Sequence, residues 1–365
     1  MTTTFSPSKS RTLTAAEIEA FGAEVEALKQ KHLADVGEKD AQYIRNIEKA
    51  VRYTEIAGRG LLMAGIFPPA FVAGATLLGV SKILDNMELG HNVMHGQYDW
   101  MNDPHLNGKT FEWDLVGTGD HWRKTHNYSH HTYTNIKGMD EDIGYGVLRL
   151  FPEQRWRPFF LGQPIYAIIF ALLFQWGVAI QDLRFGKFFN GKKSGKEMLD
   201  EMKPFLKKTR RQLIKDYVIF PLLAGPFFVP VILGNLVANG IRNLWTYMII
   251  FCGHFTADVQ LFPKSVLKNE TRGHWYFRQI RGSSNLRGSK LLHVMSGNLS
   301  HQIEHHLFPD IPAHRYAELS VEVRAICERY GVHYNSGSLV SQFSQVIWRI
   351  LRYSLPGKYV PINAT

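Results

Sequence analysis

Long apolar stretches are the clearest pattern in this chain, and prolines divide the first of them. Residues 61–84 are long enough to cross the hydrocarbon core of a bilayer once, but Pro68-Pro69 interrupts them. We therefore predict a helical hairpin, with one helix ending at about Phe67 and the next running from about Ala70 to His95. At about 1.5 Å per residue, the second helix would be roughly 39 Å long. This exceeds the ~30 Å core, so its far end should reach water.

The second long apolar stretch, residues 217–254, is predicted to form another hairpin. Its arms are about Tyr217–Leu233 and Leu236–Phe251, and Gly234-Asn235 between them is the expected turn. Together with the first hairpin, at about 55–95, this gives four membrane-spanning helices. Two hairpins return the chain to the side of the bilayer from which it started.

A third apolar segment, Pro158–Ile180, could span a membrane on hydropathy alone, but the residues after it argue otherwise. Residues 181–216 contain eleven Lys or Arg against five Asp or Glu. The positive-inside rule places such a segment in the cytoplasm, and a crossing by Pro158–Ile180 would translocate it. We therefore interpret Pro158–Ile180 as an in-plane or partly buried helix, and residues 181–216 as a basic cytosolic loop.

The N-terminal part is predicted to hold a short disordered tail and one amphipathic helix. Residues 1–12 form the tail, and Thr14 with Glu17 makes a capping-box pattern. Apolar residues at helical spacing follow: Ile18, Phe21, Val25 and Leu28. We accordingly divide the chain into residues 1–40, which comprise the tail and this helix, and residues 41–365, which form the main domain.

The C-terminal third is more polar. It is predicted to be loop-rich from Gly253 to Leu291, and Pro309 should end the helix that follows. Two surface helices are expected beyond it, at Glu318–Tyr330 and Phe343–Arg352.

Bulk composition hides this membrane character. Hydrophobic residues make up 45% of the 365 residues, yet the mean hydropathy is only −0.17, because the apolar residues are concentrated in a few segments. The formal net charge is +10, of which residues 181–216 contribute +6 (eleven minus five). The two cysteines, Cys252 and Cys327, cannot build a disulfide framework and suit a reducing compartment. The N-terminus lacks an apolar core behind a basic head, so no secretory signal peptide is expected.

Histidine is distributed very unevenly along the chain. Eight of the sixteen histidines occupy three short windows, and in each window the first two histidines are four residues apart. On an α-helix this spacing places both imidazoles on one face. Imidazole is the commonest metal ligand, and eight are more than one tetrahedral site uses, so a pair of metal ions is the economical interpretation. The eight are His91, His95, His126, His130, His131, His301, His305 and His306.

The windows GHNVMHGQYDW, HWRKTHNYSHHTYTN and GNLSHQIEHHLFPDIP resemble the three histidine boxes of integral-membrane fatty acid desaturases. The resemblance covers roughly residues 41–359 and is strongest to the acyl-CoA desaturases of mycobacteria and related actinobacteria. It implies an all-α membrane fold, in which four transmembrane helices carry a cytosolic helical cap. It also implies two non-haem iron ions held by histidines in that cap, and O2-dependent insertion of a double bond into an acyl chain.

The same resemblance implies that the eight box histidines are metal ligands and that His254, at the end of the last apolar arm, is a ninth. A helix-end histidine facing the last carbonyls is the alternative for His254. In the third box His301 has the four-residue spacing, whereas Gln302 occupies the first position of the shorter pattern found in many relatives. We predict His301, because imidazole binds iron better than an amide. No catalytic residue beyond the ligands is predicted, and the candidates for orienting them are Glu88, Gln302 and Asp140.

The resemblance further implies an acyl-CoA or acyl-lipid desaturase that introduces a cis double bond, with Δ9 on a stearoyl-type substrate favoured. The sequence contains no HPGG haem motif. Electrons are therefore expected from a separate NADPH-dependent flavin and iron–sulfur reductase or from a ferredoxin. The basic residues 181–216 would attract an acidic partner, the CoA phosphates or anionic lipid heads, and no nucleic-acid partner is expected. The expected location is the inner membrane, with several spans and with the active site and both termini in the cytoplasm.

Three rival functions stay open at the level of sequence. A front-end desaturase fits the Gln302 pattern, and a di-iron lipid hydroxylase or ketolase would use the same histidines. A zinc-stabilised membrane scaffold or receptor is the non-enzymatic alternative, although a closed zinc site needs only four ligands.

Overall fold

The computed structural model describes residues 11–362, which are mainly helical and carry one pair of short strands. The described chain divides into two compact units. The first takes in the described residues of Met1–Glu38, His126–Ile168 and Met248–Thr365, and the second Lys39–Thr125 and Ile169–Tyr247. The disorder predicted for residues 1–12 falls mostly on residues outside the described range.

The helices and strands of the first unit are α1 (Ala15–Ala34), α6 (His131–Tyr133), α13 (Arg272–Arg281), β1 (Asn285–Arg287), α14 (Lys290–Met295), α15 (Gln302–Leu307), α16 (Tyr316–Tyr330), β2 (Ser336–Ser338) and α17 (Leu339–Ser354). Those of the second unit are α2 (Glu38–Met63), α3 (Pro68–Ile83), α4 (His91–Met94), α5 (Gly119–Trp122), α8 (Phe174–Asp182), α9 (Phe185–Phe189), α10 (Gly195–Ile214) and α11 (Phe220–Leu223). Helices α7 (Gln163–Leu172) and α12 (Phe228–His254) have residues in both.

The predicted N-terminal helix is confirmed as α1. The Thr14 hydroxyl accepts from the Glu17 backbone N–H, and the Thr14 N–H donates to the Glu17 carboxylate, which completes the capping box. Its four predicted apolar residues are all buried, in a core shared with α13, α15 and α16. The close approach to α13 depends on glycine, because a Cβ on Gly22 would lie 2.5 Å from the Cα of Gly273.

The C-terminal region is more ordered than its sequence indicates. The segment predicted to be loop-rich, Gly253–Leu291, contains helix α13 and strand β1. Strands β1 and β2 pair in parallel, so the strictly all-α prediction is modified by this short ladder. The two predicted surface helices are present as α16 and α17, and each buries one side of its surface. The third box's helix, α15, ends at Leu307, just before Pro309.

The second unit contains the predicted first hairpin. Helix α2 ends at Met63 and α3 begins at Pro68, so both prolines lie in the first turn of α3, where a missing N–H costs no helical hydrogen bond. The two helices touch backbone to backbone. A Cβ on Gly58 would lie 2.7 Å from the backbone nitrogen of Leu78, and one on Gly74 would lie 2.9 Å from that of Leu62. Small residues at such contacts are typical of helices that pack within a membrane.

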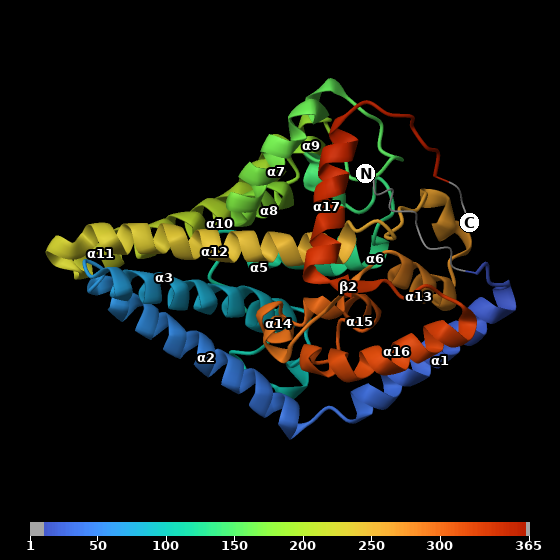
Figure 1. Cartoon of the computed structure of the whole chain (residues 1–365), viewed down its shortest axis with the longest axis horizontal. Coiled ribbons are helices and arrows are strands. Elements are labelled where there is room, and N and C mark those ends of the chain that lie inside the picture. The colour runs from blue at the N-terminus through green and yellow to red at the C-terminus, as the bar shows by residue number, and fades with distance from the viewer. Residues whose placement is uncertain (1–10, 363–365) are drawn as a thin grey trace. The chain divides into compact units, whose positions relative to one another are not determined.

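The predicted turn of the second hairpin is wrong. Helix α12 runs unbroken through Gly234-Asn235, and the chain turns instead around Gly225, whose φ is +56° (Figure 1). The residues misread as a turn have packing roles. A Cβ on Gly234 would meet the Leu62 side chain at 2.3 Å. The Asn235 amide donates to the backbone oxygens of Val231 and Asp216, at 2.9 Å each.

The basic segment 181–216 is mainly helical, which corrects the predicted loop. Ser194 and Glu197 form a capping box at the start of α10, and this helix holds most of the segment's C-terminal half. It continues through a π-helical segment, Lys215–Ile219, into α11. The first arm of the second hairpin is therefore the end of a long helical run and does not begin at Tyr217.

The segment Pro158–Ile180 is not one straight helix. Helices α7 and α8 meet at Leu173 with a bend of 97°. Asn243 stabilises the break, because its amide donates to the Leu172 carbonyl at 2.7 Å and its oxygen accepts from the Gln175 N–H at 3.4 Å. The in-plane orientation stays a prediction.

Among the described residues, one helix, Gly225–His254, is by itself long and apolar enough to cross a membrane. Counting the bent pair Pro158–Leu172 and Phe174–Phe189 as one span gives a second. The helical hairpin of α2 and α3 falls short of this criterion, so the four-span topology stays a prediction.

Candidate metal centre

The first histidine box lies in the second unit, at the end of the first hairpin. A π-helical segment, Leu84–Gly90, leads from α3 into α4, which starts at His91. The imidazoles of His91 and His95 have ring centroids 4.7 Å apart, as the four-residue spacing predicts. Trp122 lies against both rings, at centroid distances of 5.3 and 5.4 Å, and fixes one side of the pair.

Glu88, predicted to orient these ligands, is fully buried in the π-helical segment. Its carboxylate accepts from the Tyr43 hydroxyl at 2.6 Å, and its backbone oxygen accepts from the Asn92 amide at 2.9 Å. The Asn92 side-chain oxygen in turn lies 3.3 Å from Nδ1 of His91, so these bonds join the first histidine to the backbone of Glu88 and not to its carboxylate.

The second box departs from the predicted α-helix. Arg123–His130 is π-helical, a form whose hydrogen bonds run from i to i+5 and which recurs at functional sites. Residues five apart are therefore brought together, and Nε2 of His131 lies 3.3 Å from Nε2 of His126. The rings of His126 and His130 stack at 5.2 Å.

The third box departs further. His301 ends a 3₁₀ turn, and α15 begins only at Gln302, so His301 and His305 do not share a helical face. The His301 ring lies 4.6 Å from that of His293. Burial and then the charge of His293 lower the pKa of His301 to about 4, and its Nε2 is buried without a hydrogen-bond partner. His301 is in none of the histidine groups of the first unit that could hold a metal ion.

Gln302 lies on the other side of the backbone, toward the end of α12. Its amide nitrogen is 2.9 Å from Nε2 of His254, and its side chain packs on Gly253, where a Cβ would meet it at 2.9 Å. Of the two candidates for the first position of the third box, Gln302 is thus the one beside another predicted ligand.

The other predicted ligands of the first unit converge. Each of three groups has one ligand atom per residue within 4.8 Å of the others. The groups are His130, His254 and His306; His131, His305 and His306; and His126, His130 and Asp142. Residues more than a hundred positions apart in the sequence therefore meet at one place, as the resemblance implied.

This arrangement fits bound metal ions. Nε2 of His306 lies 3.3 Å from Nε2 of His254, the same separation as in the pair His131 and His126. Two nitrogens at about 2.1 Å from one ion lie about 3.0–3.4 Å apart at ordinary coordination angles. Two neutral imidazoles that point their Nε2 atoms at each other can share at most one proton, whereas a cation between them satisfies both lone pairs. The two three-histidine groups share His306, which suits two neighbouring ions.

Asp140 holds His130 in place. Both of its carboxylate oxygens lie 3.1 Å from Nδ1 of His130, and one also accepts from the Asn135 N–H at 2.8 Å. Burial disfavours the imidazolium, but the charges of Asp140 and Asp142 outweigh it and raise the pKa of His130 to about 9. The hydrogen bond fixes Nδ1 as the donor and directs Nε2 toward the other histidines.

Two residues beside His306 have no sequence signal. Nδ1 of His306 lies 3.1 Å from the Gln279 amide oxygen and 3.2 Å from the Thr134 hydroxyl. The Gln279 amide nitrogen also donates to the backbone oxygen of His131 at 3.0 Å. Gln279 comes from α13, in the region predicted to be a loop, so its place beside the histidines could not be foreseen. Asp142, by contrast, belongs to the acidic run Asp140-Glu141-Asp142, which can be recognised in the sequence.

Comparisons with known proteins agree with this site. A family model described as fatty acid desaturase matches residues 67–338 of the chain. The chain is 46% identical over 357 residues to an NADPH-dependent stearoyl-CoA 9-desaturase of Mycobacterium tuberculosis, an alignment that covers 96% of this chain and 83% of that protein. It is 28% identical over 291 residues to an sn-1 linoleoyl-lipid 6-desaturase of Synechocystis, covering 75% of this chain and 77% of that one.

An acyl-lipid (7-3)-desaturase of Rebecca salina is also 28% identical, over 272 residues that cover 71% of this chain and 58% of that protein. The matched region contains all three histidine windows and His254. The chain therefore belongs to the fatty acid desaturase family.

Proposed function

We propose that this fatty acid desaturase introduces a cis Δ9 double bond into a stearoyl-type acyl chain carried by CoA. The observation that carries the proposal is the 46% identity to the mycobacterial stearoyl-CoA 9-desaturase, which extends over 96% of this chain. The two relatives named sn-1 linoleoyl-lipid 6-desaturase are less similar, at 28% and 23% identity. This difference favours an acyl-CoA substrate and the mid-chain position over a front-end reaction on a lipid.

We propose two non-haem iron ions as the cofactor, because the histidine groups are too numerous for one site. Bound iron would supply the oxidising power, from O2, that breaks an unactivated C–H bond. His301 or Gln302 would complete the third box. The remaining proposed ligands are His91, His95, His126, His130, His131, His254, His305 and His306.

The chain's own side chains orient these ligands. Asp140 accepts the Nδ1–H of His130, and Gln279 accepts that of His306, so each ring presents Nε2 to a cation. The Asn92 amide donates to the backbone oxygen of Glu88, and its own oxygen lies 3.3 Å from Nδ1 of His91, so Asn92 is the side chain that orients this ring. Neither three-histidine group of the first unit contains a carboxylate, whereas the third group pairs Asp142 with His126 and His130.

Electrons must be supplied from outside the substrate. The acyl chain gives up two hydrogens, a donor supplies two electrons, and with two protons O2 leaves as two waters. We propose an NADPH-dependent flavin and iron–sulfur reductase or a ferredoxin as the donor. The relative named NADPH-dependent supports this kind of donor.

The family is membrane-associated, and we propose a multi-pass protein of the inner membrane with the histidines and both termini in the cytoplasm. The hairpins would be α2 with α3, and the end of α10 and α11 with α12. The apolar length of Gly225–His254 and the glycine contacts between α2 and α3 support this proposal.

Expression in a desaturase-deficient host tests the function directly. The expected product is the cis Δ9 monoenoic acid, and it should disappear in His130→Ala. A product that has gained oxygen would identify a hydroxylase, and a double bond between an existing one and the carboxyl group would identify a front-end enzyme. Metal analysis tests the zinc-stabilised scaffold. Two irons per chain would exclude it, and one zinc per chain would favour it.

A further inference from the structure

A surface pocket of about 330 Å³ opens on the first unit, away from the histidine groups. It forms where the C-terminal part of α16 meets strands β1 and β2. Nothing in the proposed chemistry uses it. Its lining combines two arginines and one acid with polar side chains, and includes Arg287, Arg324, Glu328, His333, Tyr334 and Ser336.

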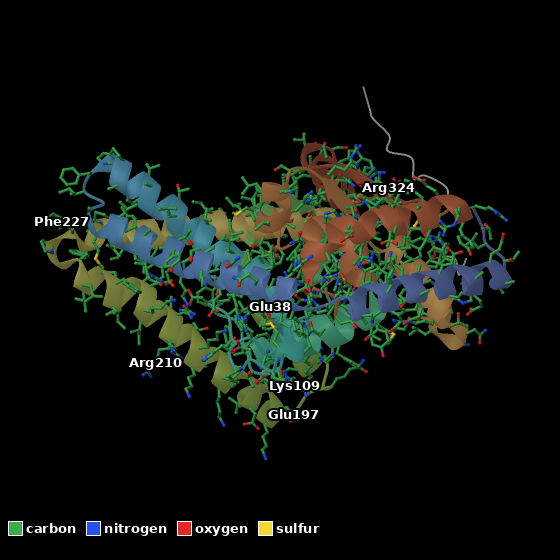
Figure 2. All side chains as sticks on the ribbon, turned by 90° about the horizontal axis from the view of Figure 1, so that it is seen from below. Glu38, Lys109, Glu197, Arg210, Phe227 and Arg324 are labelled. Carbon is green, nitrogen blue, oxygen red and sulfur yellow. The ribbon has the colours of Figure 1, made fainter. Side chains whose placement is uncertain are left out.

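Two exposed arginines, Arg287 and Arg324, give the pocket its charge, against one acid, Glu328, among the described lining residues. The guanidinium of Arg324 lies over the Tyr334 ring, 4.9 Å from its centroid, on the outer side of α16 (Figure 2). Stacking orients a guanidinium and leaves its N–H groups free for a carboxylate, which arginine can bind through two parallel hydrogen bonds. His333 is held beside it by Asp258, at 3.2 Å.

Short hydrogen bonds join the pocket to the third histidine box. The Tyr334 hydroxyl donates to Glu304 at 2.8 Å. The Asn285 amide lies 2.7 Å from the other Glu304 oxygen and 2.6 Å from the Tyr334 hydroxyl. Glu304 is fully buried and directly precedes His305. An occupant of the pocket would therefore contact Tyr334. The hydrogen-bond partner of Tyr334 is Glu304, which lies on α15 together with the proposed iron ligands His305 and His306.

The size of the pocket limits its occupant. Small-molecule sites typically have about 300–1,000 Å³, so this pocket is at the lower end and too small for a complete acyl-CoA. It suits one or two side chains of a docked protein. Arginine and tyrosine are also the residues enriched at the energetic centres of protein interfaces.

We propose that this pocket docks an acidic side chain of the electron-donor protein. The inference rests on the proposed function, because a desaturase needs a donor that approaches its metal ligands. Arg287 and Arg324 would attract the donor's carboxylates and speed association, and Tyr334 and Glu304 would set the distance of the donor from the third box.

The test compares the double variant Arg287→Glu/Arg324→Glu with Arg352→Glu, a control that reverses an exposed arginine on α17 of the same unit, outside the pocket lining. One assay measures NADPH-driven desaturation of stearoyl-CoA in membranes of the expression host, over a range of salt concentrations. The other measures the single-turnover yield of purified protein reduced with dithionite, which bypasses the donor. Iron content is measured in each variant.

At low salt we expect the double variant to lose about tenfold or more of the NADPH-driven rate, with a flatter salt dependence. Its dithionite-driven yield and iron content should stay within about twofold of the unmodified protein, and Arg352→Glu should resemble the unmodified protein in both assays. Equal losses in both assays, a loss in Arg352→Glu alone, or a raised KM for stearoyl-CoA alone would overturn the proposal. Failure of the unmodified protein with dithionite would count against the proposed function instead.

Discussion

Both carboxylate oxygens of Asp140 lie 3.1 Å from Nδ1 of His130, and the two side chains are almost completely buried. The pair links the second histidine box to the turn that follows it. Asp140 is itself held by the backbone N–H groups of Asn135 and Asp142, at 2.8 and 3.0 Å. The carboxylate can therefore fix the His130 ring without moving to do so.

We expect Asp140→Asn to lower metal affinity by about 10–100-fold, the usual cost of removing a group that orients a metal-bound histidine. An amide can still accept the Nδ1–H bond but carries no charge to stabilise the bound cation. Iron content after dialysis against a graded chelator measures the effect. Glu318→Gln, which changes an exposed acid on α16 in the same unit, is the control and should retain its iron. Equal iron retention by both variants would contradict the role of Asp140.

The first position of the third box is decided by a second pair of variants. Gln302 lies 2.9 Å from Nε2 of His254, whereas the His301 ring faces His293. We expect Gln302→Ala to lower iron content and product yield more than His301→Ala. Turning the Gln302 amide about its last bond would present its oxygen to a cation beside His254. The opposite order of effects would return the ligand role to His301.

Much of this molecule follows from sequence patterns that act locally. The capping box at Thr14 predicts where α1 begins, and Pro68-Pro69 predict the boundary at which α3 begins. Both signals can be recognised because caps and prolines act on the adjacent backbone. The clustering of histidines was also foreseen, through the resemblance to desaturases. The capping box of Ser194 and Glu197 can also be recognised in the sequence. It predicts a helix in the segment for which we expected a loop, and α10 begins there.

Other features depend on partners distant in the sequence. The dipeptide Gly234-Asn235 is typical of a turn, yet both residues lie inside α12. There Gly234 packs against Leu62, and Asn235 donates to the backbone oxygen of Asp216. Spacing alone also cannot distinguish an α-helix from the π-helix around His126, because both permit the same residues. Gln279 enters the site only through the fold of α13.

The contact between α2 and α3 predicts opposite effects for two glycines in one helix. A Cβ on Gly58 would lie 2.7 Å from the backbone nitrogen of Leu78, which cannot move aside, whereas one on Gly60 meets nothing within 4 Å. We expect Gly58→Ala to destabilise the protein by about 1–3 kcal/mol through overpacking. Gly60→Ala should be neutral or stabilising by up to about 1 kcal/mol. Thermal unfolding in detergent measures both, and equal midpoints would contradict the close contact.

The cysteines are expected to be unreactive in the folded protein. Burial, with smaller contributions from Glu304 and Glu328, raises the pKa of the Cys327 thiol to about 12. The reactive thiolate is therefore almost absent until the pH approaches that value. Cys252 is also buried. Alkylation with iodoacetamide at pH 8 should label neither thiol in the native protein and both after denaturation. Labelling of Cys327 in the native protein would show that its environment opens.

A buried acid in the second unit should be far more important to stability than an exposed one nearby. Asp216 accepts from Arg59 and from Lys82, both at 3.0 Å, and all three side chains are nearly inaccessible to water. Replacing it by Asn leaves Arg59 with Glu55, at 2.9 Å, and Lys82 with the more distant Asp114, at 3.6 Å. Breaking a buried ion pair typically costs about 3–5 kcal/mol. Asp200, paired with Lys203 on the surface of α10, provides the control.

Asp200→Asn should change stability by less than about 1 kcal/mol, because exposed ion pairs contribute little. Denaturant unfolding of the two variants in the same detergent measures the difference. If Asp216→Asn were as mild as Asp200→Asn, Glu55 and Asp114 would be sufficient counter-charges for Arg59 and Lys82. In that case replacing Lys82 by Met in the Asp216→Asn background should restore no stability. If Glu55 and Asp114 do not compensate for the lost carboxylate, the same replacement should recover part of the loss, because it removes one of the two buried cations.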